Sequence, residues 1–199
     1  MSADDQPSAM TPQTTPPGAA TARRLPGDPT PAALLDRVIR VDHAGEYGAK
    51  RIYEGQLAIL GRKHEGPVIR HMLEQELKHL DAFEKFMVER RARPSVLLPI
   101  WHVAGFALGA ATALMGPKAA MACTVAVEEV IDEHYREQLG KLGTAEPSLT
   151  EKIEVFRAEE VEHRDTGLAH GAEQAPAYPV LSSAIKAGSR LAIWLAERF

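Results

Sequence analysis

The stretches Glu76-Leu-Lys-His79 and Glu160-Val-Glu-His163 decide how this chain folds. They are the only two Glu-x-x-His patterns among its 199 residues. A single glutamate precedes each pattern, Glu46 in the first half and Glu128 in the second. The two halves are offset by 82 residues for the single glutamate and by 84 for the Glu-x-x-His pattern. One pattern alone is a weak signal, but two patterns at matched spacing indicate a built site.

Residues three apart on an α-helix point to the same side, so the Glu and His of each pattern can bind one ion together. Both pairs lie among apolar residues at helical spacing, where an unpaired charge is costly. Two divalent ions would neutralise the four carboxylates. One Glu from each of two helices and Glu-x-x-His from two others form the ligand set of ferritin-like bundles. The sequence therefore predicts an all-α, ferritin-like four-helix bundle around two metal ions, with the ligands Glu46, Glu76, His79, Glu128, Glu160 and His163.

Three further residues are expected close to these ligands. Tyr53 follows Glu46 by seven residues and Tyr135 follows Glu128 by seven, so each phenol shares a helix face with a glutamate. His134 lies directly beside Tyr135. The tyrosines can hydrogen-bond a ligand, line a substrate pocket or fill the core, and the sequence leaves these roles open. The acidic neighbours outside the ligand face are expected to be solvated charges: Glu129, Glu159 and Glu162.

Composition limits the class of protein. An apolar content of 45% and a charged content of 25% are ordinary for one globular domain of this length. A net charge of −4 gives no basic footprint for nucleic acid. The single cysteine, Cys123, cannot form a disulfide within the chain, which favours a reducing compartment.

Residues 1–31 hold seven of the fourteen prolines and show no apolar periodicity. They are expected to form a disordered tail ahead of one domain over residues 32–199. The tail lacks the apolar run of a secretory signal and the basic, acid-free composition of a mitochondrial presequence, so a bacterial protein is the simplest interpretation.

Apolar periodicity predicts five helices, four for the bundle and an amphipathic one at the C-terminus: about 32–60, 68–91, 117 to 140 or 143, 147–171 and 178–198. Residues 96–116 contain no Asp, Glu, Lys or Arg and reach the roughly 20-residue length of a membrane span. A single crossing would place the two pairs of ligand helices on opposite sides of the membrane, so the ligands could not meet. We therefore expect residues 96–116 to form a helical insert that dips into one leaflet, lies at the membrane interface or covers the bundle itself. The C-terminal helix could lie in the same plane, and the protein would then be monotopic.

At these residues the chain closely resembles the demethoxyubiquinone hydroxylase family of ubiquinone biosynthesis. The likeness covers about Leu34 to the C-terminus, and its most specific stretches are Arg40–Gly48, Glu76–His79, Met121–Glu129, Glu159–Asp165 and Ala175–Tyr178. The resemblance implies that the six predicted ligands bind two iron ions, with Glu76 and Glu160 as bridging carboxylates. The adjacent His134 and Tyr135 are also similar to the family's pattern.

The resemblance further implies a di-iron monooxygenase that hydroxylates the ring of a polyprenyl demethoxybenzoquinol with O2, the penultimate step before ubiquinone. It implies NADH as an electron donor, yet the chain contains no Gly-x-Gly-x-x-Gly fingerprint. NADH would therefore bind without a Rossmann domain, or the electrons would come through a partner or the quinol. An accessory lipid-binding or biosynthetic partner would fit such an apolar substrate. The expected location is the cytoplasmic face of a bacterial inner membrane.

Other classes of protein make different demands on the sequence. A ferritin-like iron store would share the six ligands and form a closed soluble cage, but a cage subunit has no use for the apolar residues 96–116. A membrane-surface scaffold would need the matched spacing to be a coincidence. A fatty-acyl desaturase or a radical-generating reductase subunit normally has a longer chain.

Overall fold

The computed structural model describes Gly27 and residues 29–199, so the predicted disordered tail lies largely outside the described residues. The described residues form helices joined by short turns: α1 (Pro31–Leu60), α2 (Gly66–Arg90), α3 (Leu98–Leu114), α4 (Pro117–Leu142), α5 (Pro147–Ala169), the 3₁₀ helix η1 (Ala172–Gln174) and α6 (Tyr178–Ala196). The prediction of an all-α fold is confirmed, and the predicted helix ends lie within about two residues of the observed ones.

Proline marks the start of every α-helix in the described residues, at the first or second helical position. Its fixed φ suits a helix, and its missing N–H is one that a helix start leaves without an intrahelical partner. Thr30 caps α1, because its hydroxyl oxygen accepts a hydrogen bond of 3.1 Å from the backbone N–H of Ala33. The helix starts are therefore set locally by the sequence.

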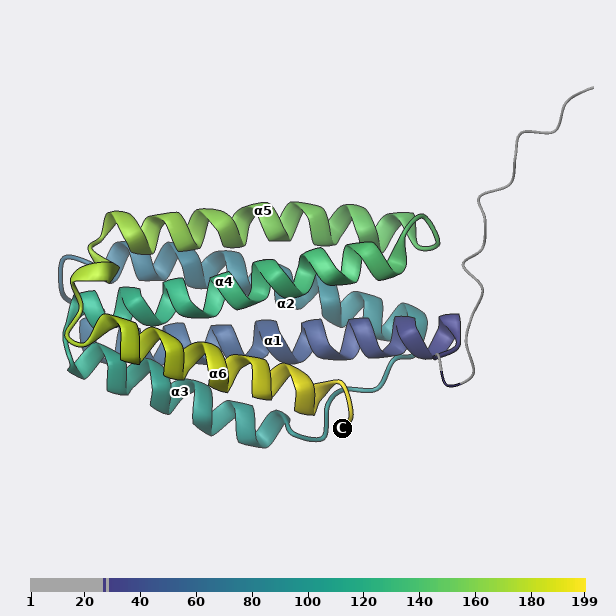
Figure 1. Cartoon of the computed structure of the whole chain (residues 1–199), viewed down its shortest axis with the longest axis horizontal. Coiled ribbons are helices and arrows are strands. Elements are labelled where there is room, and N and C mark those ends of the chain that lie inside the picture. The colour runs from purple at the N-terminus through teal and green to yellow at the C-terminus, as the bar shows by residue number, and fades with distance from the viewer. Residues whose placement is uncertain (1–26, 28) are drawn as a thin grey trace, which may run out of the picture.

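Four long helices form the bundle, and two more cover one side of it (Figure 1). Around the bundle, α1 packs on α2, α2 on α5, α5 on α4, and α4 on α1. Outside it, α3 lies against α1 and α6 lies against α4. The first three helices and the last three thus repeat one plan, a pair of bundle helices followed by a covering helix.

Two larger apolar clusters fill the bundle, and two smaller ones lie between it and the covering helices. One of the larger clusters includes Tyr53, Ile69 and Met72, and the other includes Phe83 and Ile153. Along α2 the first cluster precedes residues 76–79 and the second follows them. The predicted metal ligands therefore lie between two packed apolar regions of the core.

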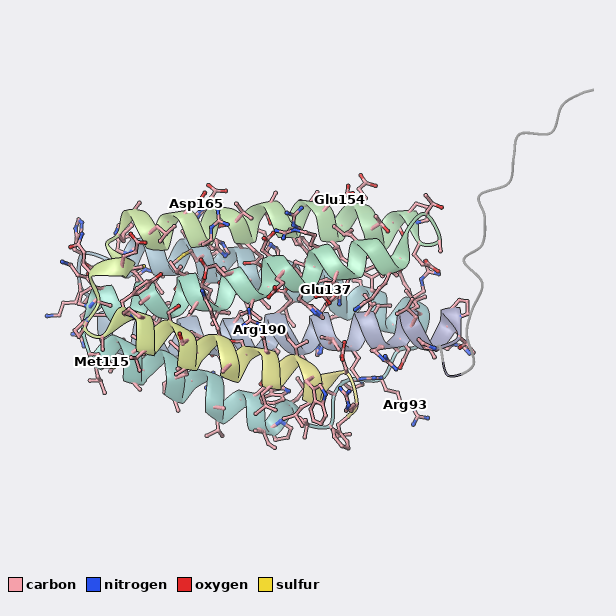
Figure 2. All side chains as sticks on the ribbon, viewed as in Figure 1. Arg93, Met115, Glu137, Glu154, Asp165 and Arg190 are labelled. Carbon is pink, nitrogen blue, oxygen red and sulfur yellow. The ribbon has the colours of Figure 1, made fainter. Side chains whose placement is uncertain are left out.

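The outer surface differs between the two sides of the molecule. On α5, Glu154 and Asp165 project away from the bundle (Figure 2). On α3 and α6, more of the exposed side chains are large and apolar: Ile100, Val103, Leu114, Val180, Leu191 and Trp194. No helix within residues 29–199 has both the length and the hydropathy of a membrane span.

Glycines allow α3 to approach α1 closely. A Cβ on Gly105 would lie 2.8 Å from the carbonyl oxygen of Gly48, and one on Gly109 would overlap the carbonyl oxygen of Ile52. From the opposite side, a Cβ on Gly55 of α1 would overlap the backbone of α3 at Phe106. Real Cβ atoms do not tolerate such contacts, so the position of α3 depends on these residues having no side chain.

We expect Gly109→Ala to lower the free energy of unfolding by about 1–3 kcal/mol, because the added methyl group forces α3 away from α1. Urea denaturation followed by circular dichroism measures the change. Gly140→Ala is the matched control, since a Cβ at Gly140 of α4 meets no atom within 4 Å. Alanine favours a helix interior, so the control should keep or raise stability by up to about 1 kcal/mol. Equal stability of the two variants would contradict the close α1–α3 packing.

Candidate metal centre

The four bundle helices bring the six predicted ligands together at the centre of the molecule. Helices α1 and α4 contribute one glutamate each, and α2 and α5 contribute one Glu-x-x-His pair each. All six residues are at most 3% exposed: Glu46, Glu76, His79, Glu128, Glu160 and His163. A buried group of four acids and two imidazoles is unstable without compensation for its charge.

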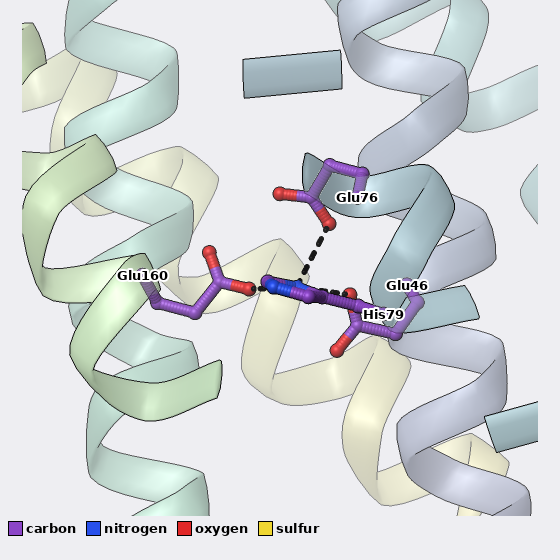
Figure 3. Close-up of side chains that lie close together, drawn as sticks. All are labelled: Glu46, Glu76, His79 and Glu160. Atoms are coloured by element: carbon purple, nitrogen blue, oxygen red, sulfur yellow. Dashed lines mark ion pairs between the residues drawn. The ribbon is translucent and has the colours of Figure 1, made fainter. Parts of the chain in front are cut away.

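The six residues form two overlapping groups of four. The first group contains Glu46 and His79, the second contains Glu128 and His163, and both contain Glu76 and Glu160. In each group, one ligand atom from every residue lies within 4.8 Å of the others. Figure 3 shows the first group, with the carboxylates of Glu46, Glu76 and Glu160 directed at the His79 ring. Two ions bridged by carboxylates require two such groups that share acidic residues, and here the shared residues are Glu76 and Glu160.

Both histidine rings turn Nδ1 toward the shared carboxylates. His79 Nδ1 lies 3.4 Å from Glu46 Oε2 and 3.0 Å from Glu160 Oε1. His163 Nδ1 lies 3.3 Å from Glu76 Oε1 and 3.0 Å from Glu160 Oε2. The Nδ1 atoms are therefore the ring nitrogens placed to bind metal, and Nε2 of each ring faces away from the cluster.

Crowding of the acids changes their pKa values. Burial, followed by the charges of Glu160 and Glu46, raises the pKa of Glu76 well above its usual value. Burial also raises the pKa of Glu128, with further contributions from Glu160 and Glu76. For Glu160 burial acts in the same direction, but hydrogen bonds from His163 and His79 outweigh it and lower the pKa to about 2.

The donor atoms of the cluster suit a metal. Burial tends to lower the pKa of His79, but hydrogen bonds with Glu160 and Glu46 outweigh it and raise the pKa to about 12. Both carboxylate oxygens of Glu76 are buried with no hydrogen-bond partner among the described residues. Buried polar atoms are normally paired, so these unpaired atoms mark where an ion fits. Carboxylate and imidazole donors suit divalent iron and related transition metals.

Two tyrosines hold the single glutamates by hydrogen bonds that cross the bundle. Tyr53 of α1 donates to Glu128 Oε1 of α4 at 2.8 Å, and Tyr135 of α4 donates to Glu46 Oε1 of α1. Sequence spacing placed each tyrosine beside the glutamate of its own helix, whereas the structure pairs it with the glutamate of the other. Each hydroxyl bond fixes one carboxylate oxygen and leaves the other to the cluster.

His134 lies outside the ligand cluster. The side-chain amide of Gln138 donates to Asp42 Oδ1 at 2.6 Å and to His134 Nε2 at 2.8 Å. His134 Nε2 itself is 3.6 Å from Asp42 Oδ1. His134 thus belongs to a polar group one helical turn from Glu46 and contacts Asp42 and Gln138 rather than a predicted ligand.

Sequence reasoning missed two residues that hold the histidines. Glu159 Oε2 lies 2.5 Å from His79 Nε2, and Gln75 Oε1 lies 3.0 Å from His163 Nε2. The expectation that Glu159 is only a solvated charge is therefore wrong. Their positions in the sequence could have indicated this role, because Gln75 and Glu159 each directly precede the glutamate of a Glu-x-x-His pattern. Of the other two acids expected on the surface, Glu162 is exposed and Glu129 forms an ion pair with Lys186.

Comparison with known proteins gives a consistent result. The family model described as "Ubiquinone biosynthesis protein COQ7" matches residues 33–196. The chain is 64% identical over 176 residues to a 3-demethoxyubiquinol 3-hydroxylase of Rhodospirillum rubrum, covering 88% of this chain and 83% of that one. It is 58% identical over 170 residues to the human NADPH-dependent 3-demethoxyubiquinone 3-hydroxylase, mitochondrial, covering 83% and 78%. It is 47% identical over 184 residues to the 5-demethoxyubiquinone hydroxylase, mitochondrial, of Saccharomyces cerevisiae, covering 84% and 79%.

We expect Glu160→Ala to abolish binding of two metal ions, because Glu160 belongs to both groups of donor atoms. Metal per chain, measured by elemental analysis after dialysis against Fe²⁺, should fall from about two to below one. Glu162→Ala is the matched control, since this exposed acid lies two residues away on the same helix. Full two-metal loading of the Glu160→Ala variant would contradict the site.

Proposed function

Because the chain belongs to the ubiquinone biosynthesis COQ7 family, we propose that it is a di-iron monooxygenase that hydroxylates the ring of a polyprenyl demethoxybenzoquinol with O2. This reaction would be the penultimate step of ubiquinone formation. The observation that carries the proposal is the buried pair of donor groups that share Glu76 and Glu160. In this proposal residues 32–199 act as one ferritin-like domain, with residues 1–31 as a tail.

We assign the six clustered residues as the ligands of two iron ions, with Glu76 and Glu160 bridging. The bound iron would supply the activation of O2 needed to place one oxygen atom on an electron-rich ring. The chain's own residues would hold the ions, and the apolar clusters on both sides of the site would exclude water. Tyr53 and Tyr135 would keep the single glutamates oriented through their hydrogen bonds.

An apolar cavity of about 330 Å³ lies between α1, α3, α4 and α6 and offers a place for the quinol. Its lining includes Gly45 and Val127, which directly precede Glu46 and Glu128. Small residues such as Ala104 and Ala192 leave room in it, and Trp101 and Ile193 add apolar surface. We propose that the ring enters this cavity toward the metal centre while the prenyl tail extends between α3 and α6.

The exposed apolar side chains of α3 and α6 support a position at the membrane surface. Ile100 is 56% exposed and Val103 67% exposed on α3, and Trp194 is 49% exposed on α6. Burying such residues at the interface would place the mouth of the cavity next to the layer that holds a polyprenyl substrate. We propose a peripheral location on the cytoplasmic face of a bacterial inner membrane, with an accessory lipid-binding protein as a further partner.

We propose a reduced nicotinamide dinucleotide as the electron donor. The resemblance in sequence implies NADH, whereas the names of mammalian relatives specify NADPH, and both belong to this class. The fold of residues 29–199 is helical throughout, so the dinucleotide would bind without the strand-and-helix unit of a Rossmann domain.

A single turnover tests the proposed reaction. Reduced, iron-loaded protein is mixed with a short-chain demethoxybenzoquinol and ¹⁸O₂, and the product is weighed by mass spectrometry. We expect the quinol to gain one oxygen atom that carries the label. Oxidation of the iron with an unchanged quinol would favour the iron-storage alternative and contradict the hydroxylase.

The same single-turnover reaction tests the role of the cavity in substrate binding separately from metal binding. Ala192→Trp should fill the cavity and reduce labelled product by about tenfold or more, since small misplacements of a reacting group can cost up to roughly 10²-fold. Iron loading should stay unchanged. Ala187→Trp is the control, because Ala187 is an exposed residue of α6 outside the cavity lining.

We expect Ile100→Glu combined with Val103→Glu to weaken binding to vesicles of anionic phospholipid by about tenfold or more, because each apolar side chain removed from water contributes about 1.5–3 kcal/mol. Co-sedimentation with the vesicles measures the bound fraction. Val155→Glu is the control, since Val155 is 48% exposed on α5, a bundle helix that neither α3 nor α6 contacts. Equal loss in both variants would show that α3 is not the contact surface.

A further inference from the structure

The two histidines of the metal centre are held by chemically different groups. His79 Nε2 pairs with the carboxylate of Glu159 at 2.5 Å, while His163 Nε2 pairs with the amide oxygen of Gln75 at 3.0 Å. The ligand groups themselves match between the two halves, as do the crossed tyrosine bonds. The partner of Nε2 is therefore a point at which the two metal positions differ in charge.

The contact of Glu159 determines the state of the His79 ring. An ionised carboxylate only accepts hydrogen bonds, so it requires a proton on Nε2 of the ring. The opposite nitrogen, Nδ1, is then free to bind an ion, and it faces Glu46 and Glu160 at 3.4 and 3.0 Å. A carboxylate acceptor also makes the imidazole a stronger donor toward a metal, because the hydrogen bond is charge-assisted.

The surroundings of Glu159 favour this role. Its side chain is 37% exposed, but the ring that it contacts is completely buried. Phe156 lies one turn earlier on α5 and packs against the His79 ring with centroids 4.0 Å apart. Among residues 29–199, Glu159 forms no ion pair with a lysine or arginine, so its charge is not shared with a cation in the structure.

The two partners occupy corresponding places in the two halves. Gln75 precedes Glu76 on α2 and contacts the histidine of α5, while Glu159 precedes Glu160 on α5 and contacts the histidine of α2. Gln and Glu have the same length and shape and differ here only in charge. The effect of a charged and of an uncharged partner on a histidine ligand can therefore be compared within this chain.

We propose that Glu159 is a positioning residue that makes the Glu46–His79 position bind its metal ion more tightly than the Glu128–His163 position. The proposal rests on the two-metal site of the proposed function. Partners of this kind change metal affinity by about 10–100-fold. The two ions would then load in order, the first at His79 and the second at His163.

A titration that supplies one Co²⁺ per metal-free chain tests the order. In crystals of this protein, anomalous scattering at the cobalt edge shows which position holds the ion, and calorimetry gives the two affinities. We expect the wild type to place the ion beside His79. Glu159→Gln should remove the preference, and Glu159→Gln combined with Gln75→Glu should move the ion beside His163.

The outcomes separate this proposal from the proposed function. Equal occupancy of both positions in the wild type, or an order that the exchange of the two residues does not alter, would overturn the role of Glu159. A merely structural role would weaken both positions together and would not reverse their order. Absence of Co²⁺ from both positions of the wild type would instead contradict the metal site, and with it the proposed function.

Discussion

Four carboxylates and two imidazoles buried within one apolar bundle form the constraint on which the rest of the structure depends. Burial, followed by the charges of the neighbouring acids, raises the pKa values of Glu76 and Glu128. Hydrogen bonds from two tyrosines partly compensate the charge of the acids, while contacts with Glu159 and Gln75 hold the two histidines. These hydrogen bonds use the ligand atoms that face away from the centre of the cluster. The atoms that face the centre are left to bind ions. The apolar clusters at either end of the site make that arrangement rigid.

Those parts of the structure that depend on residue spacing along one helix could be predicted from the sequence. Glu-x-x-His places two donors on one face, and prolines mark helix starts, so the bundle, its helix ends and the six clustered residues were all predictable. Contacts between helices were not, because spacing gives the face of a side chain but not its partner. Tyr53 therefore bonds to Glu128 of another helix instead of Glu46. Glu159 was expected to be a solvated charge because it lies off the ligand face of its helix. Its side chain is indeed 37% exposed, but its carboxylate also contacts His79 of another helix.

The covering helices connect the site to the surface of the molecule. The apolar composition of residues 96–116 was clear in the sequence, but its placement along α1 depends on backbone contacts at Gly105 and Gly109. The same shortage of side-chain volume on α1, α3 and α6 leaves the apolar cavity open beside Glu46 and Glu128. Small residues on facing helices thus explain both the close packing of α3 on α1 and the cavity between α1, α3, α4 and α6. A bulkier α3 would be forced off the bundle and would change the shape of the cavity together with its own position.

The repeat of one three-helix plan has a consequence for how the molecule is encoded. A symmetric pair of identical short chains, each supplying two bundle helices and one cover, would give the same crossed tyrosine bonds and the same six donors. In such a pair, however, positions 75 and 159 would be a single residue in the gene, and the two histidines would have identical partners. Joining both copies in one chain allows glutamine at one position and glutamate at the other. Covalent linkage thereby frees each metal position to be changed by mutation independently of its twin.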